Sequence, residues 1–251
     1  MDDDELGELP GLSCPVRVIR VARHADGALP LARARNAVAE EAAGPCMIFL
    51  DVDCIPAPDL VAGLAAAVGQ TAGAVMGEVA YLPEGAADED WTFASLDATA
   101  SPHPRRPRPS PGAVEPTDAY HLLWTLCVAM SKASFARAGG LDEGYRGYGA
   151  EDTDLAFRLR RADIPFALAG YRVYHQWHPV YRPPLNHFGA IVRNAERFHA
   201  QWSTWPMEGW LAQFANLGLL RWPPLDEAIH VVREPTAAEV SAALQEGGYG
   251  Y

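Results

Sequence analysis

The feature that most constrains the fold is a short, continuous apolar run that ends in two carboxylates. Residues 46–50 read Cys-Met-Ile-Phe-Leu, and Asp51 and Asp53 follow directly. A run of this length without alternation is typical of a strand buried on both faces. An alternating segment at 16–21 and an Ala-rich helical segment at 29–43 precede it. The order strand, helix, strand predicts right-handed crossovers and a largely parallel, Rossmann-like sheet, with ligands at the carboxyl ends of its strands.

The rest of the chain continues this α/β pattern. We expect further helices at 58–68, 132–138, 151–163 and 185–202, and strands at 74–81, 122–130 and 166–175. Residues 83–118 are rich in Pro and hold no sustained period, so we expect a long flexible loop there. The prediction is an α/β domain over residues 1–182, with a helical C-terminal extension over 183–251 packed on it.

Composition excludes several classes of protein. A chain of 251 residues is long enough to bury a core without disulfides, and we expect its four cysteines to be reduced and buried. The net charge of -12 argues against nucleic acid as the main partner. No apolar stretch approaches the roughly 20 residues that span a bilayer, and the acidic residues 2–5 differ from the basic start of a signal peptide. We therefore expect a cytoplasmic protein with no transmembrane segment.

Asp51 and Asp53 form the first group of residues with chemical potential. Two carboxylates separated by one residue in extended chain point to the same side. Such a pair can hold a hard divalent cation while phosphate groups supply the remaining ligands. The alternative is that both side chains only cap the helix that follows or bind water.

Glu151, Asp152 and Asp154 form the second group, at the start of an expected helix. Acidic side chains in a first turn are stabilised by the helix dipole, which is a structural role. A carboxylate on a rigid element can also act as a general base toward a hydroxyl group. The glycines at 139–149 let the backbone approach a ligand closely, which capping alone does not require.

His175 and His178 form the third group, at the end of an expected strand. A histidine is often a structural residue, but an imidazole beside carboxylates commonly completes a metal site. We favour His175 as the ligand because it leaves the strand directly, and His178 remains the alternative.

In this order, the three groups resemble the nucleotide-sugar glycosyltransferases of the GT-A fold, specifically family 2 members with a galactosyltransferase-like C-terminal half. The resemblance extends from about residue 16 to about residue 220, and residues 139–158 carry its strongest part. It implies that Asp53 is a metal ligand and that Asp51 lies near the ribose and the metal. It also implies that Asp152 is the catalytic base and that Glu151 orients the acceptor.

The resemblance assigns further residues around these carboxylates. His175 would join the metal shell, Arg35 and Asn36 would border the nucleotide, and Gly139 and Gly140 would lie against the donor sugar. The implied reaction is an inverting transfer of a hexose or N-acetylhexosamine from a nucleotide-diphosphate sugar, with UDP expected and Mn²⁺ or Mg²⁺ as cofactor. The implied acceptor is a hydroxyl group of a glycan, a lipid-linked sugar or a small molecule.

The sequence departs from the family pattern at two places. Ala150 stands where these enzymes more often have glycine, which would crowd the sugar. The segment 16–21 resembles the second strand of the family, so we expect the first strand, which helps to cradle the nucleobase, to be missing. An incomplete base pocket and an open sheet edge are the expected results.

Two other functions remain open. Haloacid-dehalogenase-like phosphatases also place Asp-x-Asp after an apolar strand, but they carry Thr or Val where this chain has Ile55. A non-catalytic binder of nucleotide sugars or glycans would keep the fold and an aromatic groove around Trp124, Trp177 and Trp205. Catalytic activity that depends on the intact carboxylates would distinguish an enzyme from such a binder.

Overall fold

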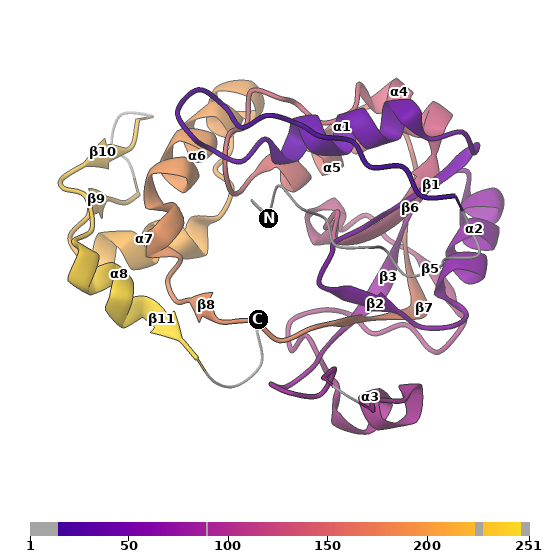
Figure 1. Ribbon diagram of the computed structural model, residues 1–251. Coiled ribbons are helices and arrows are strands. Elements are labelled where there is room, and N and C mark those ends of the chain that lie inside the picture. The colour runs from indigo at the N-terminus through magenta and orange to yellow at the C-terminus, as the bar shows by residue number, and fades with distance from the viewer. Residues whose placement is uncertain (1–14, 89, 224–227, 247–251) are drawn as a thin grey trace.

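A seven-stranded sheet forms the centre of the molecule (Figure 1). The computed structural model describes residues 15–88, 90–223 and 228–246. Five strands follow one another in the order β1-β6-β3-β7-β2, while β4 pairs with β3 and β5 pairs with β7. The strands of the sheet are β1 (Cys46–Leu50), β2 (Cys54–Pro56), β3 (Ala74–Tyr81), β4 (Ser101–Pro102), β5 (Val114–Pro116), β6 (Cys127–Ser131) and β7 (Phe166–His175).

The strand directions bring three strand ends to one edge of the sheet. β6 is antiparallel to both of its neighbours, β1 and β3, while β3 and β7 are parallel. Therefore β1, β3 and β7 all run in the same direction, and Asp51, Tyr81 and His175 lie at their carboxyl ends. The expected α/β sheet is confirmed, but its pairing is mixed because β6 is inserted between β1 and β3.

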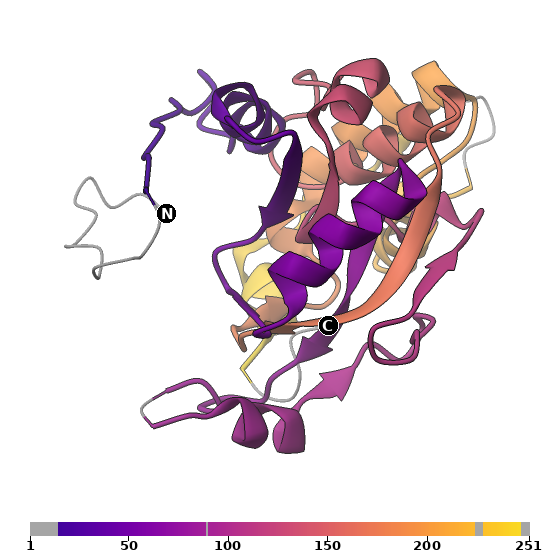
Figure 2. The ribbon, with the colours of Figure 1, turned by 90° about the vertical axis from the view of Figure 1, so that its right-hand side faces the viewer.

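Helices cover the sheet. Helix α2 (Leu60–Thr71) contacts β1, β3, β6 and β7, and Figure 2 shows it lying across the sheet. Helix α4 (Lys132–Ala138) packs on β6 and on α5 (Glu151–Arg161), while α1 (Leu31–Glu41) lies beside them (Figure 1). The apolar stripe expected on α5 is present, because Leu155 and Leu159 are fully buried in the main core. Its three acidic residues in the first turn and three arginines in the last turn complement the helix dipole.

The C-terminal part has a hydrophobic cluster of its own. It contains Phe188, Ile191, Leu211 and Phe214, all buried. The remaining elements of the described chain are α3 (Phe93–Thr99), η1 (Tyr120–Leu122), β8 (Val180–Tyr181), η2 (Leu185–His187), α6 (Phe188–Trp202), α7 (Glu208–Asn216), β9 (Leu220–Arg221), β10 (His230–Val231), α8 (Ala237–Ala243) and β11 (Leu244–Gln245). Helices α6, α7 and α8 gather at the end of the molecule away from α2 (Figure 1).

The strand expected at 16–21 is not formed. This segment has no strand partner, and Val16 and Val18 are each about half exposed, at 50% and 51%. Alternation of Val with Arg predicts a strand only where a neighbour can pair with it. Within the described residues, β1 therefore pairs with β6 alone and its other edge carries no strand.

The segment 83–118 contains elements that its composition did not predict. Thr92 and Ser95 form a capping box that starts α3, and β4 and β5 attach the segment to the sheet. Arg108 also donates to Glu78 of β3 at 2.6 Å. These elements are only two to seven residues long, too short to produce a visible period.

Two further expectations can be compared with the structure. Cys54 and Cys127 are buried, Cys46 is half-buried, and all three are free thiols, while Cys14 lies outside the described residues. No helix in the described ranges combines the length and the apolar character that crossing a membrane requires.

Candidate active site

The first group of the site joins an acid and two histidines. The pairing of β2 with β7 sets Cys54 opposite His175, and the amide of Gln176 donates to the carbonyl of Asp53 at 2.7 Å. As a result, Nε2 of His175 and Nε2 of His178 each lie 3.7 Å from Oδ2 of Asp53. One ligand atom from each residue lies within 4.8 Å of the others, a spacing that suits a single metal ion.

The state of His175 fits a metal ligand. Burial is the main cause that lowers the pKa of His175, which favours the neutral imidazole that metals bind. Its Nδ1 is buried and has no hydrogen-bond partner among the described residues. Nε2, the other ring nitrogen, is the one that faces the carboxylate of Asp53 and could bind a metal, while the unpaired Nδ1 departs from the rule that buried polar atoms are satisfied. The structure thus brings both candidate histidines to Asp53.

Asp51 has a different partner. Nη2 of Arg35, on α1, donates to Oδ1 of Asp51 at 3.0 Å, and Nη1 of the same guanidinium lies 3.9 Å from Oε1 of Glu151. Burial raises the pKa of Asp51, although the charge of Arg35 acts in the opposite direction. Burial acts to lower the pKa of Arg35. The negative charges of Asp152, Asp51 and Glu151 outweigh this effect, and the pKa is raised. Arg35 therefore joins the first and second acidic groups into one site.

Asp152 is held by a residue that the motifs did not identify. The Oγ1 hydroxyl of Thr125 donates to Oδ1 of Asp152 at 2.6 Å, and the amide of Thr125 donates to Oδ2 at 3.0 Å. Thr125 is fully buried, just before β6. These two hydrogen bonds fix the orientation of the Asp152 carboxylate. The remaining lone pairs of its oxygens can accept a proton.

Glu151 is in a different electrostatic state from Asp152. Its side chain is buried, and this burial together with the charge of Asp152 raises the pKa of Glu151 to about 7, although Arg35 acts against the shift. Burial therefore favours the neutral, protonated form of Glu151. Protonated, its carboxyl can donate a hydrogen bond, which an ionised carboxylate cannot do.

Asn36, Gly139 and Gly140 lie together in a separate group. The Asn36 amide donates to the carbonyl of Leu141 at 2.9 Å and accepts from its N–H at 3.0 Å. Gly139 and Gly140 have φ of +83° and +65° where α4 ends, and a Cβ on Gly140 would lie 3.0 Å from Oδ1 of Asn36. A Cβ on Gly139 would lie 3.4 Å from Nη1 of Arg158, so both glycines lie where α4 ends against α1 and α5, and their place beside the donor sugar stays a prediction.

Aromatic rings line the side of the site formed by β3 and the segment before β6. The ring centroid of Tyr81 lies 5.0 Å from that of His175 and 6.0 Å from that of His103, and His103 lies 5.5 Å from Trp124. The guanidinium of Arg106 stacks on Trp124 at 3.4 Å. Trp205 lies elsewhere, in the C-terminal cluster, where it stacks on His199. The expected aromatic groove therefore includes Trp124 but not Trp205.

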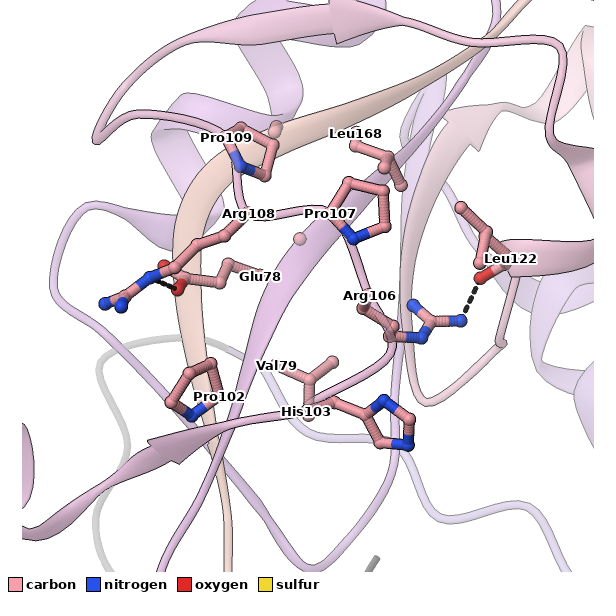
Figure 3. A pocket seen from close by; sticks show the side chains of 12 residues that line it. Glu78, Val79, Pro102, His103, Arg106, Pro107, Arg108, Pro109, Leu122 and Leu168 are labelled. Carbon is pink, nitrogen blue, oxygen red and sulfur yellow. Dashed lines mark hydrogen bonds and ion pairs between the residues drawn. The ribbon is translucent and has the colours of Figure 1, made fainter.

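The pocket in Figure 3 is too small to hold a nucleotide sugar. It lies under residues 102–109, next to Glu78 and Val79 of β3, and measures about 20 Å³. That volume holds about one water molecule. The figure shows Arg108 bound to Glu78 and Arg106 bound to the carbonyl of Leu122, so this region attaches the segment to the sheet.

Two protein families match the part of the chain that contains these site residues. Residues 13–114 match the family described as glycosyl transferase family 2, and residues 112–179 match the N-terminal domain of galactosyltransferase. Both matches are to families of glycosyltransferases. The two matches adjoin and include every site residue described above, from Arg35 to His178. The resemblance read from the sequence is therefore confirmed.

Two similar curated proteins, both validoxylamine A glucosyltransferases, come from Streptomyces hygroscopicus subsp. jinggangensis and subsp. limoneus. Each is 32% identical to this chain over 80 residues, or 30% of the chain. The chain covers 18% and 17% of their lengths, so it aligns with less than a fifth of either. A solved structure of GalNAc-T7 with UDP, GalNAc and Mn²⁺ has a TM-score of 0.42 and 18% identity, covering 74% of this chain and 40% of that one.

Proposed function

We propose that this chain transfers a hexose or N-acetylhexosamine from a nucleotide-diphosphate sugar, with UDP as the nucleotide, to an acceptor hydroxyl. The observation that carries the proposal is the joining of the two motifs by Arg35, with Asp53 and its histidines on one side and Glu151 and Asp152 on the other. A metal and diphosphate site must adjoin a base in such a reaction, and the similar Streptomyces proteins are named as glucosyltransferases.

In the proposal, Asp53, His175 and His178 hold a divalent cation. One carboxylate oxygen and two imidazole nitrogens suit Mn²⁺ better than Mg²⁺, because Mg²⁺ prefers oxygen ligands. The cation would supply positive charge to the departing diphosphate. Arg35 would add a second positive charge at the same edge of the sheet.

Asp152 acts as the general base in this proposal. Thr125 fixes both of its oxygens, so the carboxylate can accept the proton of the acceptor hydroxyl in one direction. Glu151, whose pKa is raised to about 7 mainly by burial, orients the acceptor through a hydrogen bond. Attack by the acceptor on the face of the anomeric carbon opposite the diphosphate would invert its configuration.

Thermal unfolding with UDP and Mn²⁺ tests the donor side. We expect the pair to raise the melting temperature of the wild type and to have no effect on Asp53→Ala, because a ligand stabilises the folded state that binds it. Glu115→Ala changes an exposed acid on β5 and should respond like the wild type. Absence of any shift in the wild type with every nucleotide diphosphate would contradict the proposal.

Hydrolysis of a panel of nucleotide sugars tests the reaction. The wild type should release nucleotide from at least one donor, and Asp152→Asn should bind that donor but release nucleotide at least 100-fold more slowly. Binding without turnover in the wild type would instead support a non-catalytic nucleotide-sugar binder. Hydrolysis of a generic phosphoester would support a phosphatase.

A further inference from the structure

Helix α6, which lies beyond the residues matched by the two families, reaches the backbone just before the catalytic carboxylates. Asn194 of α6 is fully buried. Its Nδ2 lies 3.2 Å from the carbonyl of Arg146, 3.2 Å from that of Tyr148 and 2.9 Å from that of Gly149, while its Oδ1 accepts from the amide of Arg146 at 3.3 Å. One side chain thus lies within hydrogen-bond distance of four backbone groups in a four-residue segment, and the two N–H bonds of its amide are shared among three carbonyls.

The segment needs such support because of its backbone conformation. Gly147, Gly149 and Ala150 have φ of +73°, +98° and +73°, a region that residues with a side chain rarely adopt. Ala150 is also the N-cap of α5 and makes no side-chain capping bond. The direction in which α5 begins, and with it the position of Glu151, therefore depends on contacts from outside the segment.

Further contacts to this segment come from residues 26–29, where the carbonyl of Leu29 accepts from the amide of Gly147 at 3.1 Å, and from the C-terminal part. The ring of Tyr148 stacks on His187 with centroids 4.6 Å apart. A Cβ on Gly149 would lie 2.7 Å from Sδ of Met207, so that methionine closely covers the glycine. The C-terminal part therefore packs against residues 146–149.

We propose that Asn194 is a positioning residue for Glu151 and Asp152, which rests on the proposed glycosyl transfer. It fixes the backbone of residues 146–149, and this backbone sets where the first turn of α5 presents its carboxylates to the acceptor. Asn194 touches neither substrate nor the reacting atoms. Helix α6 then contributes to the reaction through this one side chain and the backbone that it holds.

The test compares Asn194→Ala with Val192→Ala. Val192 is buried on the same helix, at 6% exposure, and packs in the C-terminal cluster. Its truncation therefore removes buried side-chain packing from α6, as Asn194→Ala does, but leaves the hydrogen bonds of Asn194 in place. For Asn194→Ala we expect the affinity for UDP with Mn²⁺ to stay within twofold of the wild type, while kcat for hydrolysis of the preferred donor falls at least tenfold. For Val192→Ala we expect kcat to stay within threefold, even if its melting temperature falls further.

Hydrogen exchange gives a second readout that does not require activity. In Asn194→Ala the amide of Arg146 should exchange at least tenfold faster, whereas Leu155 and Leu159 in α5 should keep their protection. Unchanged exchange at Arg146, a wild-type kcat in Asn194→Ala, or an equal loss of kcat in Val192→Ala would each overturn the proposal. If the wild type turns over no donor, the proposed function fails, and the Arg146 exchange alone decides whether Asn194 holds the segment.

Discussion

Arg35 and Asp51 are joined by a 3.0 Å hydrogen bond from Nη2 to Oδ1, and the same guanidinium approaches Glu151. A cation on α1 thus lies between the carboxylate that follows β1 and the one that begins α5. The arginine is largely buried, with 17% of its side chain exposed. Its charge offsets repulsion between acids that the fold brings to one edge of the sheet.

Replacing Arg35 tests this role. We expect Arg35→Met to lower the free energy of unfolding by about 3 kcal/mol, because its loss leaves the buried Glu151 and the partly exposed Asp51 without their cation. Arg35→Lys should recover only part of the loss, since an ammonium group cannot contact two acids as a planar guanidinium does. Urea unfolding measures the change. Arg17→Met, which removes an exposed ion pair with Glu41, should cost under about 1 kcal/mol, and an equal cost for both would contradict the interpretation.

The protonation of Glu151 predicts how stability depends on pH. Its pKa is raised to about 7 in the folded protein, mainly by burial, from 4.5. The stability that the protonated side chain contributes is fully present below pH 4.5 and is lost as the pH rises through about 7. We therefore expect Glu151→Gln to lose less stability between pH 5 and pH 8 than the wild type. Melting temperatures across that range measure the difference, and parallel curves would show that Glu151 ionises normally.

Much of the site could be predicted from sequence because its residues follow strands. The run at 46–50 placed Asp51 and Asp53, and the strand at 166–175 placed His175, since carboxyl ends of strands with a common direction meet at one edge. The helix at 132–138 was predicted with its observed bounds. Local patterns were sufficient in these segments because burial and period agree.

Contacts between distant segments could not be predicted in this way. Thr125 and Asn194 lie in no recognisable motif. The residue that Thr125 binds is 27 residues away along the chain, and those that Asn194 binds are 45 to 48 residues away. The alternating segment at 16–21 shows the opposite failure. It has the period of a strand, but no strand of the described chain pairs with it.

Thr125 should control the rate through the direction of Asp152. We expect Thr125→Val to lower kcat about 10- to 100-fold, because a hydrogen bond to a charged group contributes about 1.5–3 kcal/mol. KM for the donor should change less than threefold, since Thr125 contacts the base and not the metal group. Thr125→Ser keeps the hydroxyl and should restore most of the activity. Steady-state kinetics on the preferred donor measure both constants, and a Ser variant as slow as the Val variant would contradict this role.

Asp154 completes the acidic motif but should act on stability and not on chemistry. It is fully buried and accepts from Nε of Arg158 at 2.6 Å and from Nε1 of Trp202 at 2.8 Å, which attaches α6 to α5. In Asp154→Asn the side-chain NH2 group replaces one acceptor oxygen and faces the N–H of Arg158 or of Trp202. Two buried donors then oppose each other, so we expect a loss of about 3–5 kcal/mol in unfolding free energy.

The exposed Asp163 at the end of α5 provides the control for Asp154. Asp163→Asn should change the unfolding free energy by about 0.5 kcal/mol or less, because surface substitutions rarely cost more. Trp202→Phe removes one of the two close donors and should cost less than Asp154→Asn. At a temperature where Asp154→Asn remains folded, its kcat should stay within about threefold of the wild type, because the carboxylate contacts structural donors. A stable Asp154→Asn protein with a large loss of kcat would instead place Asp154 in the reaction itself.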